Sequence, residues 1–355
     1  PILYLFFKIC NENYHFNIWS DSLSCDKLFA QAKIICYMNR SHSCTYANIH
    51  SALQVTDFWS KTIIMEKWSW DFAFVSPKLS NTFRTFVAKT IKMQILLSCA
   101  KDMVDAAPNL ALSTTLPQFQ HEAEQTSVYL MKYSTTELAE MLQINPQLAS
   151  LNKLRYTHFL EPSPTLPAIL AYNGIVYKRL DAASMSVQQL QYADQHLWLT
   201  SFLYGLLRPL NGIKNYRLEG CVQLPEYDNQ TMFDFWKPRL TQLLIDAVRA
   251  DDGVLLNLAS AEMKKMFDWK RIKKSVRIIE PAFKVRKNGK LKTIVVYTKM
   301  CRGGLARHAI IHHAHTVDAL KTFEYEGFVY NEQESKGDEL VFCLLYTSPS
   351  PRDAT

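Results

Sequence analysis

The chain has 355 residues, with 40 Lys and Arg against 33 Asp and Glu and a formal net charge of +7. Hydrophobic residues make up 48% of it, enough for a large core, and no run of about 18 apolar residues indicates a membrane span. The eight cysteines include no C-x-x-C pair, which argues against a zinc ribbon or a thioredoxin-like site and favours reduced, cytosolic thiols.

The first 92 residues differ in composition from the rest of the chain. They contain no glycine, although average usage of about 7% would give about six, and left-handed turn positions need this residue. We interpret residues 1–92 as translated upstream sequence, with a genuine extra domain as the alternative. Residues 343–355 contain a Ser/Pro-rich stretch that we interpret as an artefactual or disordered tail.

A short apolar run, Gln94–Ser98, predicts a buried strand just before Lys101. Ser98 and Lys101 have the spacing of a Ser/Lys nucleophile dyad, but the partner motifs S-D-N and K-T-G are absent. We therefore favour Lys101 as an anion-contacting residue over Ser98 as a nucleophile.

Helical patterning covers residues 116–152, and Ser134 followed by Glu137 has the form of a capping box. Further along, residues 190–204 carry apolar residues at helical spacing, Pro209 stops an ordinary helix, and an Asn-Gly pair at 211–212 predicts a tight turn. We expect two short helical pieces to meet at a hairpin, where backbone N–H groups and cations suit a phosphate. The cations of this hairpin are Arg208, Lys214 and Arg217. Ordinary surface arginines on a loop are the alternative.

The next part of the chain predicts a helix at Phe233–Ala250 and a buried strand at Val254–Leu258. Ser260 follows as an N-cap for a helix at Ala261–Phe267, whose N-terminus is a possible anion site. A plain cap, with Glu262 at the positive end of the helix dipole, is the favoured interpretation.

Strands are also predicted at Arg277–Phe283, Lys292–Thr298 and Glu339–Phe342, with a hairpin turn at Asn288-Gly289. An early strand, a helical middle and late antiparallel strands indicate an α+β fold. We expect one domain over residues 93–342, with a mixed β-sheet and surrounding helices.

Charge is distributed unevenly along this domain. Residues 264–307 contain fifteen Lys and Arg and two acids, whereas residues 93–263 contain twelve against seventeen. A single-sign block of this kind is the footprint expected for a phosphate backbone.

A histidine cluster follows the basic block, in the pattern H-x3-H-H-x-H at His308, His312, His313 and His315. The nearest acid is Asp318, so the cluster lacks the carboxylate of a facial triad. We favour surface histidines and predict no metal site and no cofactor.

Five ordered motifs resemble those of the YaaA family of bacterial peroxide-stress proteins. They are MQILLSCAK at 93–101, AYNGIVYKRL at 171–180, LYGLLRPL with NYRLEG at 203–220, NLASAE at 257–262 and YTKMCRGGLAR at 297–307. Cys99 stands where the family usually has proline. The resemblance implies a cytoplasmic protein that helps limit free iron during peroxide stress and binds DNA through a helix-hairpin-helix element.

Three functions remain open. The first is a non-enzymatic protein that binds double-stranded DNA without sequence preference through its phosphates. The residues expected to contact phosphate are Lys101, Arg208, Lys214, Arg217, Lys264, Lys265, Lys273, Lys274, Lys299, Arg302 and Arg307. The alternative is an enzyme acting on a nucleotide-like or phosphorylated ligand in a cationic pocket, with Glu262 as the acid/base candidate. An iron-sequestering protein is a third, less favoured reading.

Overall fold

The computed structural model describes residues 3–9, 12–19, 33–37, 93–106, 112–287, 290–314 and 316–344. The chain divides into two compact units, Pro1–Lys89 and Thr90–Thr355. In the first unit the described residues are three strands, β1 (Leu3–Ile9), β2 (Glu12–Trp19) and β3 (Lys33–Tyr37), paired as an antiparallel sheet. The interpretation of residues 1–92 as upstream translation stays a prediction.

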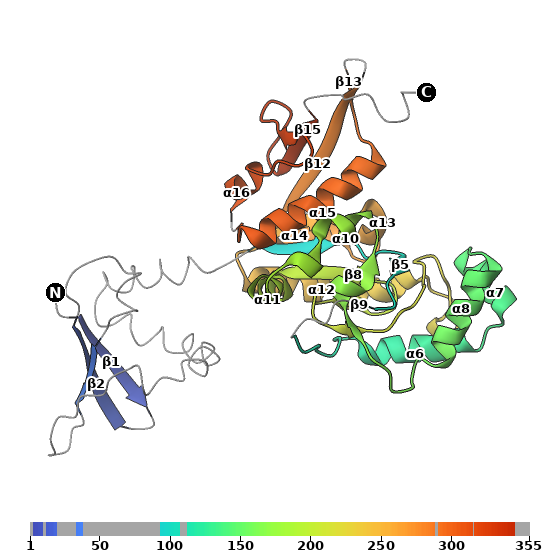
Figure 1. The fold of residues 1–355 in the computed structure, drawn as a ribbon, viewed down its shortest axis with the longest axis horizontal. Coiled ribbons are helices and arrows are strands. Elements are labelled where there is room, and N and C mark those ends of the chain that lie inside the picture. Colours follow the sequence, from blue (N-terminus) through green and yellow to red (C-terminus); the bar gives the residue numbers. More distant parts are fainter. Residues whose placement is uncertain are drawn as a thin grey trace. The chain divides into compact units, whose positions relative to one another are not determined.

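The second unit is built on an eight-stranded sheet (Figure 1). Its order is β14-β15-β12-β11-β4-β8-β9, with β13 paired to β12. The five strands from β15 to β8 run parallel, whereas β9, β13 and β14 pair antiparallel with their neighbours. The strands are β4 (Gln94–Leu97), β8 (Leu197–Ser201), β9 (Gly205–Leu207), β11 (Val254–Leu258), β12 (Arg277–Lys287), β13 (Lys290–Lys292), β14 (Phe328–Tyr330) and β15 (Glu339–Leu344). The predicted α+β class with a mixed sheet is confirmed.

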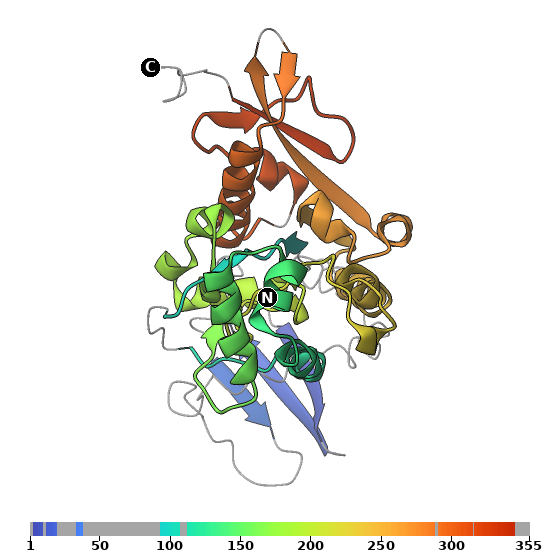
Figure 2. The ribbon, with the colours of Figure 1, turned by 90° about the vertical axis from the view of Figure 1, so that its right-hand side faces the viewer.

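Helices cover both faces of this sheet (Figures 1 and 2). One face carries α10 (Ile175–Leu180), α11 (Val187–His196) and α15 (Val295–Ile311), and the other carries α12 (Met232–Ala250) and α14 (Trp269–Ser275). The predicted helix at 233–250 is confirmed as α12, because its apolar residues at helical spacing all lie in the core. These are Phe235, Trp236, Leu240, Leu244 and Val248.

Three further helices form a group beyond β5 (Asp102–Met103), which directly follows β4 (Figure 1). They are α6 (Gln120–Met131), α7 (Thr135–Leu142) and α8 (Pro146–Thr157). The predicted capping box of α7 is confirmed, since the Ser134 side chain accepts from the Glu137 N–H and the Glu137 carboxylate accepts from the Ser134 N–H. The Tyr156 hydroxyl of α8 donates to the Arg217 carbonyl, so this group closes onto the segment after β9.

Short elements complete the described fold. They are β6 (Leu166–Pro167), α9 (Ala168–Ala171), β7 (Tyr172–Asn173), η1 (Ala182–Ser184), β10 (Gly212–Ile213), η2 (Pro225–Tyr227), α13 (Ala261–Lys264) and α16 (Val317–Lys321). Ser260 caps α13 as predicted, through a hydrogen bond from the Met263 N–H, but the helix is shorter than expected. Among the described residues no helix has the length and apolar character to cross a membrane.

The predicted helix at 190–204 is wrong in its second half. Helix α11 ends at His196, and β8 and β9 then pair as an antiparallel hairpin. All five residues of β8 are buried, and a strand buried on both faces has a near-continuous apolar pattern that cannot be told from a helix by periodicity. Gly205 closes the hairpin with φ +70°, where a Cβ would lie 2.7 Å from the Trp236 ring. The helix-hairpin-helix implied by the resemblance is therefore not verified by α11, β8 and β9.

The predicted strand at 292–298 is also wrong, because β13 ends at Lys292 and α15 begins at Val295. Two β-branched valines at the start of that helix give it a strand-like composition. The hairpin between β12 and β13 is confirmed by the pairing of Lys287 with Lys290, although its turn residues, 288 and 289, lie outside the described ones.

Candidate functional site

The parallel strands place one edge of the sheet at a topological switch point. From β4 the sheet extends to β8 on one side, and β11 is added later on the other side of β4. In open α/β sheets, ligands bind outside the carboxyl ends of the strands at such a point. The loops after β4 and β11, residues 98–101 and 259–262, therefore define the candidate site, which we call the switch-point site.

Backbone and side-chain contacts hold these two loops together. The Ser260 N–H donates to Ser98 Oγ at 2.9 Å, and the Tyr177 hydroxyl of α10 donates to the Ser98 carbonyl at 3.0 Å. Gly174 approaches so closely that a Cβ there would lie 3.2 Å from Ala100 Cβ. Three segments far apart in sequence thus meet within a few ångströms.

A buried carboxylate organises the charges of the switch-point site. Glu219 accepts from Lys101 Nζ at 2.7 Å with one oxygen and from Arg217 Nε at 2.9 Å with the other. The Glu219 side chain is 10% exposed, whereas that of Lys101 is 58% exposed. Glu219 therefore fixes the direction of the ammonium group while leaving its outer side open to solvent.

Beneath these charges lies a network of neutral hydroxyl groups. The Tyr216 hydroxyl lies 2.8 Å from that of Tyr172 and 2.7 Å from Ser201 Oγ, and burial raises the pKa of both tyrosines. Thr200 Oγ1 accepts from the Cys99 N–H at 3.1 Å. Burial, opposed in part by Thr200 and reinforced by nearby carboxylates, raises the pKa of Cys99 to about 12, so the thiol is neutral near pH 7.

Helix α15 packs on α10, whose Tyr177 contacts Ser98, and it carries a further cation, Arg302. Its Gly303 packs on α10, where a Cβ would lie 2.1 Å from the Val176 carbonyl oxygen. Arg302 lies one and two turns before Ala306 and Ala309, on the buried face of the helix. Burial lowers the pKa of Arg302, and Arg302 makes no hydrogen bond or ion pair with any residue that the structure describes.

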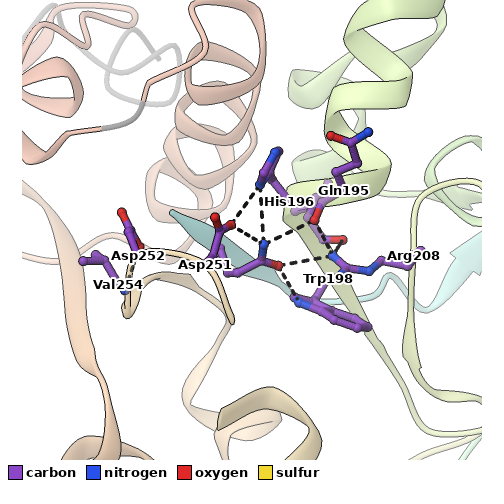
Figure 3. Close-up of polar contacts among 9 residues, drawn as sticks. Gln195, His196, Trp198, Arg208, Asp251, Asp252 and Val254 are labelled. Atoms are coloured by element: carbon purple, nitrogen blue, oxygen red, sulfur yellow. Dashed lines mark hydrogen bonds and ion pairs between the residues drawn. The ribbon is translucent and has the colours of Figure 1, made fainter. Parts of the chain in front are cut away.

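Arg208 lies in a different cluster, at the amino-terminal ends of the strands (Figure 3). Its guanidinium covers the Trp198 ring at 3.3 Å and donates to Gln94 Oε1 at 3.2 Å and to the Gln195 carbonyl at 3.0 Å. Gln94 in turn donates to Asp251, which contacts His196 at 3.2 Å. Burial lowers the pKa of Arg208 to about 10. Arg208 and Arg217 therefore occupy separate clusters, not one hairpin surface.

Several other predicted phosphate contacts are used inside the protein. Lys214 Nζ donates to the carbonyls of Phe159 and Glu161, and Arg307 donates to the carbonyls of Leu180 and Asp181 at the end of α10. Lys264 and Lys273 both pair with Glu280. The remaining lysines of the prediction lie on the surface. They are Lys265, Lys274 and Lys299.

The Ser98–Lys101 pair, which was not favoured as a nucleophile dyad, and the histidine cluster have separate explanations. Ser98 Oγ receives the Ser260 N–H and Lys101 pairs with Glu219, so each side chain has its own partner. His308 Nε2 lies 3.2 Å from the Ala319 carbonyl, and burial lowers the pKa of His308. Within the described ranges, which leave out His315, no three His, Cys, Asp or Glu side chains are grouped as metal ligands.

Several residues of the switch-point site could not be assigned a role from local sequence patterns. Glu219, Tyr172, Tyr216 and Thr200 are joined to it by contacts across many residues of chain, such as the 118-residue separation of Lys101 and Glu219. The loops after predicted strands pointed to this edge, and Tyr172, Tyr216 and Glu219 lie within motifs that carried the family resemblance, although no role was predicted for them. Glu262, the predicted acid/base candidate, is exposed in the second loop and is close enough to Cys99 to raise its thiol pKa.

Fold and site together define a protein with a mixed β-sheet covered by helices and a charged, hydrogen-bonded site at a topological switch point. The family model of the peroxide stress protein YaaA matches residues 93–334. A UPF0246 protein of Bacteroides fragilis is 50% identical over 251 residues, 70% of this chain and 98% of that protein. UPF0246 proteins of Porphyromonas gingivalis and Neisseria meningitidis are 42% and 34% identical, over 71% and 70% of this chain and 100% and 97% of their own lengths. The chain belongs to the YaaA (UPF0246) family of peroxide stress proteins, and the resemblance seen in the sequence is confirmed.

Five segments that carried this resemblance have parts at or beside the switch-point site. The segments at 93–101, 171–180 and 257–262 meet through Ser98, Tyr177 and Ser260. The segment at 203–220 contributes Glu219, and the segment at 297–307 packs Gly303 onto α10. Parts of all five motifs therefore lie at or beside this edge of the sheet, whereas Arg208 and Gln94 of the same motifs lie at the amino-terminal ends of the strands.

Proposed function

We propose that the protein is a cytoplasmic DNA-binding protein of the peroxide stress response that helps limit free iron. In this proposal it holds double-stranded DNA by its phosphates without sequence preference. The contact is the basic surface, which we define as the exposed cations of α13, α14 and the β12–β13 hairpin with their flanking residues. These are Lys265, Lys270, Arg271, Lys274, Lys287, Lys290 and Lys292.

The observation that carries the proposal is the lack of acidic groups able to neutralise these cations from within the same segment. Asp268 accepts from the Arg271 N–H as the cap of α14. Burial opposes ionisation of Glu280, but Lys264 lowers its pKa overall, and Glu280 also pairs with Lys273 at 3.6 Å. Both acids are thus used internally, and a phosphate backbone is the complement of the remaining positive charge.

Salt dependence of DNA binding tests the proposal. Each phosphate contact contributes about 0.9 to the slope of log K against log salt for duplex DNA. The double change Lys265→Gln with Lys274→Gln should therefore flatten the slope by about 1.8 and weaken binding to unrelated duplex sequences alike. Fluorescence anisotropy with two labelled duplexes, over a series of salt concentrations, measures both effects.

A matched control removes two lysines outside the basic surface, Lys178→Gln with Lys237→Gln. This control should leave the slope unchanged, because both lysines lie away from residues 264–292 in sequence and on other helices. A folded Lys265/Lys274 variant that binds as the parent does at every salt concentration would show that DNA, if bound at all, is held elsewhere.

The role in iron limitation is what the resemblance in the sequence implies, and the family description supports the link to peroxide stress. Its test is the level of chelatable iron in peroxide-treated bacteria that lack the gene, measured by electron paramagnetic resonance. Complementation with the parent should lower that level. If complementation with the Lys265/Lys274 variant works equally well, DNA binding and iron limitation are separate properties.

A further inference from the structure

We infer that the switch-point site binds a small phosphorylated molecule, with Lys101 and Arg302 as the residues that contact its phosphate. This inference is independent of the DNA-binding proposal. It uses a different edge of the protein and a different set of cations, and it begins from the position of the site in the sheet.

The topology is the first argument. Loops 98–101 and 259–262 leave the carboxyl ends of the adjacent strands β4 and β11, where the order of the sheet reverses. In open α/β sheets this is the position at which ligands bind, and here the hydrogen bond from the Ser260 N–H to Ser98 Oγ holds the two loops side by side. Ser98, Cys99 and Ala100 are partly exposed there, although the strand before them is fully buried.

The charges of the site are the second argument. Lys101 and Arg217 both pair with Glu219, one positive charge more than that nearly buried carboxylate needs. Glu262 of the second loop is the other carboxylate of the site, but it is exposed and screened by water. Asp102, at 3.8 Å from Arg217, is 79% exposed and is screened by water. Lys101 has three N–H donors and uses one of them on Glu219, so two are directed outward and can donate to a phosphate.

Arg302 provides the third argument. A half-buried guanidinium normally has acceptors, because desolvation of a charge without a partner is unfavourable. Arg302 has none among residues 93–106, 112–287, 290–314 and 316–344, and burial lowers its pKa. A planar guanidinium is suited to bidentate contact with phosphate oxygens, so a bound phosphate would supply the missing acceptors.

The buried Tyr172–Tyr216–Ser201 hydroxyl network is the fourth argument. Its hydroxyls are paired with one another, and burial keeps both tyrosines protonated. Because these hydroxyls are neutral, the network adds no negative charge that would repel a phosphate. This distinguishes the switch-point site from the basic surface, whose lysines lie on exposed segments.

Calorimetric titration of the full chain with pyrophosphate, AMP and adenosine tests the inference. Pyrophosphate and AMP should bind and adenosine should not, because only the first two carry phosphate. Lys101→Met and Arg302→Gln should each weaken AMP binding about tenfold or more, as expected for loss of a charge-assisted hydrogen bond. The control Lys274→Met removes an exposed lysine of the basic surface and should change AMP affinity by less than about twofold.

Three results would overturn the inference. They are absence of binding by pyrophosphate and AMP, equal weakening by Lys274→Met, and weakening of duplex DNA binding by Lys101→Met with AMP affinity unchanged. The last result would assign Lys101 to the DNA contact. Thermal melting of each variant verifies folding, and Lys101→Arg, which keeps the charge of an exposed side chain, provides a second variant that should retain part of the affinity.

Discussion

Arg208 was expected from the sequence to contact phosphate, whereas its contacts in the structure support a role in stability. If it were a surface phosphate contact, Arg208→Ala would leave stability unchanged and flatten the salt slope of DNA binding by about 0.9. In the structure its guanidinium stacks on the Trp198 ring and donates to the Gln94 side-chain oxygen and to the Gln195 carbonyl (Figure 3). We therefore expect Arg208→Ala to affect folding and not DNA binding.

The size of the effect follows from these contacts. Hydrogen bonds to a charged group contribute about 1.5–3 kcal/mol, and a desolvated cation–π contact adds up to about 2 kcal/mol. Removing the desolvation of the guanidinium offsets part of this loss, since burial already disfavours the charged form. The expected destabilisation is about 2–4 kcal/mol.

Guanidinium chloride unfolding measures this destabilisation as a lower midpoint at unchanged slope. Arg208→Lys is the matched control, because it keeps the charge but loses the planar fork that reaches both acceptors, and it should recover only part of the stability. An Arg208→Ala protein with the midpoint of the parent and a flatter salt slope would refute the structural role and restore the predicted phosphate contact.

Two further predictions concern the core. Burial raises the pKa of Cys301 to about 12, with Glu326 as a secondary cause, from an ordinary value of 9.0. Above pH 9 the unfolded chain loses this thiol proton and the folded chain keeps it, so the free energy of unfolding should fall by about 1.4 kcal/mol per pH unit up to pH 12. Urea unfolding at pH 8–10.5 measures this slope. Cys301→Ala should remove the part of the slope that Cys301 contributes. An identical slope in the variant would contradict the assignment. Gly303→Ala should destabilise the protein by about 3 kcal/mol or more in the same assay, because its Cβ meets the backbone of α10 at 2.1 Å, whereas Gly253→Ala, with φ +79° and open space, should cost only about 1 kcal/mol.

Elements with a local cause were predictable from the sequence. The capping box of α7, the Ser260 cap and the pairing of β12 with β13 each depend on residues within a few positions of one another. The amphipathic pattern of α12 was equally clear, since one face of a surface helix is enough to define it. These predictions needed no knowledge of the partners across the core.

The predictions that failed depended on distant residues. β8 is a strand because β4 and β9 lie on either side of it, and α15 is a helix although it begins with two valines. The contact of Arg208 with Gln94 could not be predicted locally either, because 114 residues separate the two in the chain. The pairing of Lys101 with Glu219 likewise follows from how the strands are ordered in the sheet, which no local pattern encodes.

The basic surface and the switch-point site differ in kind, and salt should separate them. Lysines of the basic surface have long flexible stems on exposed segments, so their attraction for a polyanion is a sum of many screened contacts and falls steeply with salt. Lys101 is held by the nearly buried Glu219 carboxylate, and Arg302 lies on the same face of α15 as buried residues. A ligand at that site meets only a few oriented charges and releases no condensed counterions, so its affinity should depend weakly on salt. One salt series with duplex DNA and with AMP therefore tells whether the family's motifs serve the same ligand as the basic surface or a second one.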